Sequence, residues 1–489
     1  MGSEEVYYQA MLARDYRFDG KFFVGVKTTG IYCRPICPAK PKRANVEFFP
    51  TSFLAEKKGY RPCLRCRPEA APQSPAWSGK SALVQRALKA IADQEYPELD
   101  ENGFAERFGV SSRHLRRLFE DEIGKSPKRI ILANRLDFAR KLIVETAIPM
   151  GEIAFSSGFT SIRRFNDAVK DRFKRAPSLL RNGPRQRRSL PEQSEDPARG
   201  ITLSLPFRPP FDWEASLAYY RLHGIAGLES FAGNAYERVF RWDGEPGIIR
   251  VTQGSLPTSL SLQVIAAETK ALGRIVQNVR RMFDLDSDPL LVANAFSGSP
   301  RLARLLGKKP GLRAPRGWDA YETAVCSILG QLVSIGQANR MISQLVRGYG
   351  DRIAHPLTGE GIHLFPAPQV LADSDLDRVG TTGARKATLR EFCGRLADGK
   401  ISLHCAQDPD RFRASLLAIK GIGPWTAEYI SLRAIADTNA FPATDLILKR
   451  ALEADPKMDL DSVRPWRGYA AAYLWNEHAG MAAAKEKRK

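Results

Sequence analysis

Four cysteines in two close pairs constrain the first part of this chain most strongly. Cys33 and Cys37 flank three residues of a proline-bearing turn, and Cys63 and Cys66 form a CxxC pair. A single tetrahedral ion can collect four thiolates at this spacing, and Zn²⁺ is the usual occupant of such a site. Two disulfides are the alternative, but the chain opens MGSEEVYYQA without an apolar signal segment, which favours a reducing compartment. The sequence therefore predicts a four-thiolate zinc site in a cytoplasmic protein.

Composition limits the class of protein. At 489 residues the chain is long enough for about three domains, and its hydrophobic fraction of 43% is typical of globular proteins. No apolar run approaches the length of a membrane span. Lys and Arg number 74 against 54 Asp and Glu, a formal net charge of +20, which favours nucleic acid over a membrane surface as partner. Charge alone is weak evidence, so the motifs must identify the partner.

The residues around the cysteines carry a family resemblance. The runs TTGIYCRPICPAK, ANVEFF and YRPCLRCRP resemble the amino-terminal domain of the Ada family. Those domains hold zinc on four cysteines and use one of them to take a methyl group from an alkylated DNA phosphate. The resemblance implies that Cys33 is the methyl acceptor, and that Cys37, Cys63 and Cys66 are the remaining zinc ligands.

The chemistry of such a site agrees with this role. Zn²⁺ with four thiolates carries a net charge of about −2, so its sulfur is a strong nucleophile at neutral pH. Methylation removes one negative charge, and repair would therefore raise the affinity for the DNA backbone. A zinc knuckle without chemistry is the alternative. Basic residues near the cysteines are candidates for phosphate contacts: Arg34, Lys40, Lys42, Arg43, Arg61, Arg65 and Arg67.

Two helix-turn-helix patterns follow a linker rich in Pro and Ser. In the first, FAERFGVSSRHLRRLFEDEIGKSP, a short helix ends at Gly109, and Ser111 or Ser112 caps the next helix. In the second, SSGFTSIRRFNDAVKDRF, Gly158 stands at the turn and Ser161 begins the second helix. The helix through NRLDFARKLIVET would join them. Two such units tied by a helix resemble the AraC family of transcription regulators, in which each second helix enters the major groove. Candidate DNA contacts, each of which could equally touch phosphate or only solvent, are Arg113, Arg116, Arg117, Arg163, Arg164 and Asn166.

The second half of the chain has a different character. Residues 183–199 are charged and Pro-rich with almost no apolar residue, which predicts a disordered linker. Strand-like runs from Ile201 predict a small antiparallel α+β subdomain, and mainly helical sequence follows from about Ala267. In SLLAIKGIGPWTAEYISLRA, Gly421 and Gly423 form a hairpin between two helices. Such a helix-hairpin-helix binds the DNA backbone through its N–H groups without reading sequence.

An aspartate follows this hairpin. Asp445 lies 22 residues after Gly423 in FPATDLILKRAL. A helix-hairpin-helix with an aspartate at this spacing resembles the base-excision DNA glycosylases. Residues 201–479 resemble the AlkA type, the broad-range 3-methyladenine DNA glycosylase, through LGQLVS, GIGPWTAEY and PWRGYAAAYLW.

The resemblance implies roles for single residues. Asp445 would be the catalytic carboxylate, and Leu332 would plug the gap left by the flipped base. Tyr429, Trp425 and Trp475 would be aromatic residues of the hairpin and base pocket. Trp425 also stands where strand-cutting relatives carry a lysine, which implies base removal without β-elimination. Judged singly, the aspartate could be only a helix N-cap and the tryptophans only core residues.

The motifs together predict a multidomain α+β protein. Its parts are a small zinc-bound α/β module (1–75), an all-α double helix-turn-helix domain (80–182), the linker (183–199), a small antiparallel α+β subdomain (200–280) and a mainly helical helix-hairpin-helix glycosylase domain (281–489). We expect a cytoplasmic monomer that binds Zn²⁺ and double-stranded DNA and responds to alkylation damage.

Three activities are expected of this chain. It would accept methyl groups from methylphosphotriesters, regulate transcription with RNA polymerase as a partner when activating, and hydrolyse the N-glycosidic bond of alkylated purines such as 3-methyladenine. One alternative is a transcription regulator whose glycosylase-like half binds DNA without catalysis. Another is a repair enzyme whose helix-turn-helix only adds nonspecific affinity.

Overall fold

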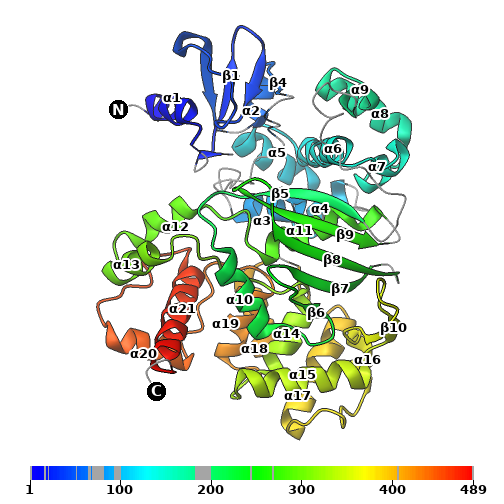
Figure 1. The fold of residues 1–489 in the computed structure, drawn as a ribbon, viewed down its shortest axis with the longest axis vertical. Helices are drawn as coiled ribbons and strands as arrows, with labels where there is room; N and C mark the ends of the chain where they lie inside the picture. Colours follow the sequence, from blue (N-terminus) through cyan, green and yellow to red (C-terminus); the bar gives the residue numbers. More distant parts are fainter. Residues whose placement is uncertain are drawn as a thin grey trace. The chain divides into compact units, whose positions relative to one another are not determined.

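The computed structural model describes residues 3–486 apart from 16–17, 20, 51, 64–65, 67, 69–81, 93–100, 182–199, 243–244, 267–268 and 405–406 (Figure 1). The chain forms two compact units. One holds Met1–Pro209, Val251–Gln277 and Leu285–Asp288; the other holds Pro210–Arg250, Asn278–Asp284 and Pro289–Lys489. No helix in the described ranges is long and apolar enough to span a membrane. The domain boundaries drawn from the sequence stay predictions, and the linker 183–199 lies outside the described residues.

A small four-stranded sheet forms the cysteine-bearing module. The strands are β1 (Phe23–Val26), β2 (Ile31–Cys33), β3 (Val46–Phe49) and β4 (Arg61–Pro62), in the order β3-β1-β2-β4, with α1 (Ser3–Ala13) and α2 (Ser52–Lys57) beside them. β4 runs parallel to β2, and the other pairs are antiparallel. Successive strand residues face opposite sides, so Val24 packs with α1 while Phe23 packs with Tyr32 and Phe49. Cys33 therefore sits at the end of a fixed strand.

Two helix-turn-helix units follow, as predicted. The helices are α3 (Ala82–Ala92), α4 (Glu101–Glu106), α5 (Ser112–Ile123), α6 (Pro127–Glu145), α7 (Met150–Ser156), α8 (Ile162–Phe173) and α9 (Pro177–Arg181). Gly109 and Gly158 have φ of 71° and 79° at the two turns, a conformation that favours glycine. Ser111 and Ser161 cap α5 and α8 by accepting backbone N–H groups, and α6 joins the two units. The predicted double helix-turn-helix is confirmed.

An ion network joins the cysteine-bearing module to these helices. Glu56 of α2 accepts hydrogen bonds from Tyr32 Oη and Lys125 Nζ, both at 2.8 Å, and forms an ion pair with Arg172 of α8. Arg172 also lies 2.9 Å from Asp137 of α6. Burial raises the pKa of Glu56, but the charges of Arg172 and Lys125 outweigh it and hold that pKa below its usual value. The module and the second helix-turn-helix unit thus share one largely buried carboxylate.

The second half contains one larger sheet and many helices. The strands are β5 (Ile201–Pro206), β6 (Glu229–Ser230), β7 (Tyr236–Trp242), β8 (Glu245–Gln253) and β9 (Ser259–Ala266), in the order β5-β9-β8-β7-β6. The helices are α10 (Trp213–His223), α11 (Leu272–Met282), α12 (Pro289–Phe296), α13 (Pro300–Lys308), α14 (Ala320–Leu329), α15 (Ile335–Tyr349), α16 (Pro368–Asp373), α17 (Gly383–Ala397), α18 (Pro409–Leu417), α19 (Pro424–Arg433), α20 (Leu446–Ala454) and α21 (Arg467–Glu486). A short hairpin, β10 (Arg352–Ala354) with β11 (Gly361–His363), interrupts the helices. The predicted multidomain α+β class is confirmed.

We expect Glu56→Gln to lower the free energy of unfolding by about 3 kcal/mol at pH 7, because a neutral amide leaves the buried Arg172 with one fewer negative partner. Glu56 has a folded pKa below the reference value of 4.5. Its contribution is therefore fully present above about pH 4.5 and is lost as the pH falls through the folded value. Urea unfolding of the full chain at pH 7 and at a series of lower pH values measures the difference.

Glu47→Gln is the matched control. Its carboxylate pairs with Lys58, whose side chain is 59% exposed, so solvent screens the pair and we expect a much smaller loss than for Glu56→Gln. Equal losses for the two variants, or a Glu56 effect that does not change on acidification, would contradict a buried ion pair between the modules.

Candidate functional site

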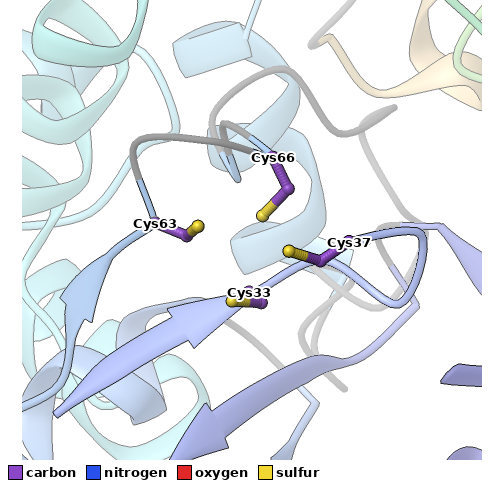
Figure 2. A group of neighbouring side chains, drawn as sticks. All are labelled: Cys33, Cys37, Cys63 and Cys66. Atoms are coloured by element: carbon purple, nitrogen blue, oxygen red, sulfur yellow. The ribbon is translucent and has the colours of Figure 1, made fainter. Parts of the chain in front are cut away.

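The four predicted cysteines meet at one point. Figure 2 shows their side chains pointing toward one another, with Cys33 on β2 and Cys63 just after β4. Their Sγ atoms all lie within 4.8 Å of one another. Four sulfurs at the Zn–S distance from one tetrahedral ion lie about 3.8 Å apart, so the cluster fits that ion. Cys33, Cys37, Cys63 and Cys66 are all free of disulfides, so the disulfide alternative is not realised.

The position of Arg34 corrects the expectation that this residue contacts DNA phosphate. Its side chain is buried, its Nε donates to Asp19 Oδ1 at 2.7 Å, and its Nη1 donates to the carbonyl of Cys66 at 3.2 Å. Its backbone N–H donates to Cys66 Sγ at 3.3 Å. In this structure Arg34 braces the cysteine loop from inside and does not face solvent. The partner, Asp19, is 15 residues away in the sequence, so local sequence could not show this.

The other basic candidates fall into two groups. Arg43 is partly exposed and pairs with Glu4 at 2.9 Å, whereas Arg65 and Arg67 lie outside the described residues. The candidates on the two helix-turn-helix units are all exposed: Arg113, Arg116 and Arg117 on α5, and Arg163, Arg164 and Asn166 on α8. Arg116 donates two hydrogen bonds to Glu101, at 3.0 and 2.7 Å. Both second helices therefore present polar and basic side chains to solvent.

Asp445 is held by four N–H donors. Its Oδ1 accepts the backbone N–H groups of Ile447 and Leu448 at 3.0 and 3.2 Å, which makes it the N-cap of α20. The same oxygen accepts the indole N–H of Trp475 at 3.1 Å, while Oδ2 accepts that of Trp425 at 3.0 Å. Asp445 is thus both a cap and an oriented carboxylate, and the two interpretations of the sequence are compatible.

Aromatic rings surround this carboxylate. Trp425 stacks on Tyr429 with ring centroids 5.0 Å apart, and Tyr429 meets Trp475 edge-on at 6.0 Å. All three rings are only partly buried, unlike residues of a sealed core. The structure therefore brings together the aspartate and the three aromatic residues that the sequence predicted.

Three further residues belong to this cluster and were not predicted. The guanidinium of Arg433 lies 4.8 Å from the ring of Tyr219 and 5.2 Å from that of Trp475. His223 stacks on Tyr219 at 4.3 Å, and burial lowers the pKa of His223 to about 4, so its ring is neutral at pH 7. A helical spacing of four residues relates Tyr219 to His223 and Tyr429 to Arg433. This four-residue spacing was the feature of the sequence that could have marked His223 and Arg433 as neighbours of the aromatic rings.

Glu428 of α19 is the alternative candidate for the catalytic carboxylate. It accepts the backbone N–H of Phe441 at 3.0 Å and lies 3.5 Å from Arg413. These contacts are those of a structural side chain that closes a loop. Glu428 does not share the indole donors of Asp445.

The glycine hairpin and the predicted wedge are both exposed. Gly421 has φ of 92°, and a Cβ there would lie 2.1 Å from Thr388 Oγ1, so only glycine fits. Gly423 caps α19 in extended conformation. Leu332, between α14 and α15, is 101% exposed with φ of 54°. The side chain of Leu332 is therefore fully open to solvent in the loop between these two helices.

Three known families match successive parts of the chain. Residues 6–69 match the metal binding domain of Ada, residues 104–183 match a helix-turn-helix domain, and residues 202–319 match the AlkA N-terminal domain. The resemblances inferred from the motifs are confirmed in the same order.

One relative spans nearly the whole chain. A probable bifunctional transcriptional activator/DNA repair enzyme AlkA of Mycobacterium tuberculosis is 37% identical over 480 residues, which cover 96% of this chain and 95% of that protein. The chain belongs to this family. It is a DNA-binding member, and its four-cysteine cluster holds Zn²⁺.

Two shorter relatives divide the chain between them. DNA-3-methyladenine glycosylase 2 of Escherichia coli is 28% identical over 279 residues, 56% of this chain and 96% of that protein. The bifunctional transcriptional activator/DNA repair enzyme Ada of Escherichia coli is 39% identical over 122 residues, 25% of this chain and 33% of that protein. The family thus joins in one chain two modules that also occur in separate proteins.

We expect one Zn²⁺ per chain by mass spectrometry of the metal, and Cys66→Ser to lower the content at least tenfold after dialysis, because a hydroxyl is a poor ligand in a four-thiolate set. Chelation at neutral pH should also reduce the helix and strand content of the full chain. Cys326→Ser, which removes a thiol outside the cluster, should keep one ion per chain. Full zinc content in Cys66→Ser would remove Cys66 from the ligand set.

Proposed function

We propose that this protein excises alkylated purines such as 3-methyladenine from double-stranded DNA, with Asp445 as the catalytic carboxylate. The observation that carries the proposal is the carboxylate held between the indole N–H groups of Trp425 and Trp475 inside an aromatic cluster. Alkylation gives a purine a positive charge, and partly exposed rings attract such a cation once the nucleotide is flipped out of the stack.

The reaction needs little more than this arrangement. The bond between C1′ and the purine nitrogen breaks, and its electron pair neutralises the cationic base. Asp445 stabilises the positive charge that develops on the sugar, and water then adds hydroxide to C1′ and releases a proton. The chain offers Trp425 where strand-cutting relatives have an amine, so hydrolysis without β-elimination follows from the same site.

We expect Asp445→Asn to lower the single-turnover rate of 3-methyladenine release about a thousandfold, because the amide keeps the shape of the cap but loses the charge. Binding to the same duplex should be retained. Chromatography of bases released from methylated DNA measures the rate, and a filter or fluorescence assay measures binding.

Glu428→Gln is the control for this experiment, and we expect its rate to stay within a few-fold of wild type. Loss in Glu428→Gln with full activity in Asp445→Asn would move the catalytic role to Glu428. Binding without release in the wild-type protein would instead favour a regulator whose second half has lost catalysis.

We also infer that Cys33 accepts a methyl group from a DNA methylphosphotriester. Bound zinc keeps all four sulfurs as thiolates at neutral pH. The backbone N–H of Arg34, the residue after Cys33, donates to Cys66 Sγ at 3.3 Å. Cys33 stands in the run TGIYCRP, the motif position of the methyl acceptor in the Ada family that this part of the chain matches.

The transfer balances without a further reactant. A bond forms between Cys33 Sγ and the methyl carbon while the bond from that carbon to the phosphate oxygen breaks. The products are a thioether and an ordinary phosphodiester anion. The cluster then carries one negative charge fewer, which favours binding to DNA.

We expect peptide mass spectrometry after incubation with methylated duplex DNA to find the methyl group on Cys33 alone among the four ligands. Cys33→Ala should abolish the transfer and leave base release within a few-fold, because Asp445 belongs to a separate compact unit. A methyl group on another ligand would reassign the acceptor. Joint loss of both reactions would show that the two modules depend on each other.

The same domain organisation supports a proposal for the mode of regulation, the oligomeric state and the compartment. We infer an activator that contacts RNA polymerase once the methylated protein occupies a promoter. Two helix-turn-helix units in one chain can read two half-sites, so a monomer suffices where other regulators dimerise. Cysteines that form no disulfide and hold zinc instead suit the reducing cytoplasm.

A further inference from the structure

The loop between α14 and α15 holds its exposed leucine in an unfavourable backbone conformation. α14 ends at its C-cap Gly330, and Ser334 caps α15, which leaves Gln331, Leu332 and Val333 between the two helices. Leu332 has φ of 54°, in the left-handed region that residues other than glycine rarely occupy. Neighbouring groups must therefore hold this loop in place.

Arg385 holds the peptide bond that precedes Leu332. It lies in the first turn of α17, and its Nη2 donates to the carbonyl oxygen of Gln331 at 2.6 Å. Its Nη1 donates to Thr381 Oγ1 at 3.0 Å, which fixes the other side of the guanidinium. That carbonyl and the N–H of Leu332 belong to one planar peptide. Fixing the oxygen therefore restricts the rotation that sets φ of Leu332.

The side chain of Gln331 ties the same loop to the glycine hairpin. Its Nε2 donates to the carbonyl oxygen of Gly421 at 3.1 Å and to Thr426 Oγ1 at 2.8 Å, in the first turn of α19. Thr388 of α17 adds a second tie, because its Oγ1 donates to the carbonyl oxygen of Lys420 at 2.9 Å. α17 thus braces both the leucine loop and the hairpin.

We propose that Arg385 and Gln331 are positioning residues for base excision, which hold Leu332 at a fixed offset from the DNA-binding hairpin. The inference rests on the proposed glycosylase function. A hairpin that grips a phosphate and a side chain that enters the base stack must match the spacing of one DNA duplex. The side chain of Gln331 contacts the hairpin, and the backbone carbonyl of Gln331 accepts a hydrogen bond from Arg385. The two residues together therefore set that spacing.

A double-mutant cycle in the full-length protein tests this role. We expect Arg385→Ala and Leu332→Ala each to slow the single-turnover release of methylated purines from duplex DNA about tenfold. The double variant should be no slower than the slower single variant, because both remove the same function. Arg390→Ala removes the same charge from an exposed position on α17 and should stay within twofold of wild type. Losses that multiply in the double variant, or an equal loss in Arg390→Ala, would overturn the proposal.

A second variant and a second readout keep the test independent of folding and of catalysis. Gln331→Glu keeps the size of the side chain but sets an oxygen against the carbonyl of Gly421, and it should slow release as Arg385→Ala does. Unchanged release in a folded Gln331→Glu protein would also overturn the proposal.

Fluorescence of 2-aminopurine paired opposite a stable abasic analogue reports unstacking without bond cleavage. The wild-type protein should raise this fluorescence, and Arg385→Ala should lose most of the rise. If wild type released no base, the proposed function would fail, while this signal would still decide the role of Arg385. An equal rise in Arg385→Ala and wild type would refute the positioning role.

Discussion

Mutual repulsion of four thiolates is the constraint on which the amino-terminal module depends. Their sulfurs lie within 4.8 Å of one another, a density of charge that needs a divalent cation at its centre. The strands of this module are two to four residues long and enclose only small apolar clusters. A sheet of this size gains little from burial alone, so we expect metal binding to be coupled to folding of the module. The buried pair of Arg34 and Asp19 then fixes the cysteine loop around the ion.

Buried charge also explains why a basic chain is hard to interpret residue by residue. Arg34, Arg172, Arg238 and Arg433 are enclosed and matched by carboxylates, carbonyls or rings, whereas the arginines of α5 and α8 face solvent. All of them count equally in a net charge of +20. The surplus predicts a polyanionic partner correctly for the chain as a whole, yet it does not say which side chains meet that partner.

The sequence could predict those features that depend on interactions between residues close together in the chain. The spacing of the cysteines, the glycines at the turns and the serine caps act over a few residues, and the corresponding elements formed where expected. The aromatic site at Asp445 was found because motifs marked its members. Tyr219 and His223 approach that site from α10, far away in the sequence, and Arg34 finds Asp19 across a loop. Contacts of this kind depend on the tertiary fold, and a pattern in one segment cannot contain them.

Strand β2 has two neighbouring residues with different partners. Cys33 faces the metal cluster, and Tyr32 faces the Glu56 network that also holds Arg172 of α8. If Cys33 loses its negative charge, the change occurs at the residue next to Tyr32, which is hydrogen-bonded to Glu56. Glu56 in turn pairs with Arg172 on α8, the second helix of a helix-turn-helix unit. Since a thioether is chemically permanent, the methylated molecule would keep its record of damage for as long as it exists. Such a record fades only through dilution by growth or destruction of the protein, so the duration of the response would be set by protein turnover and not by the rate of repair.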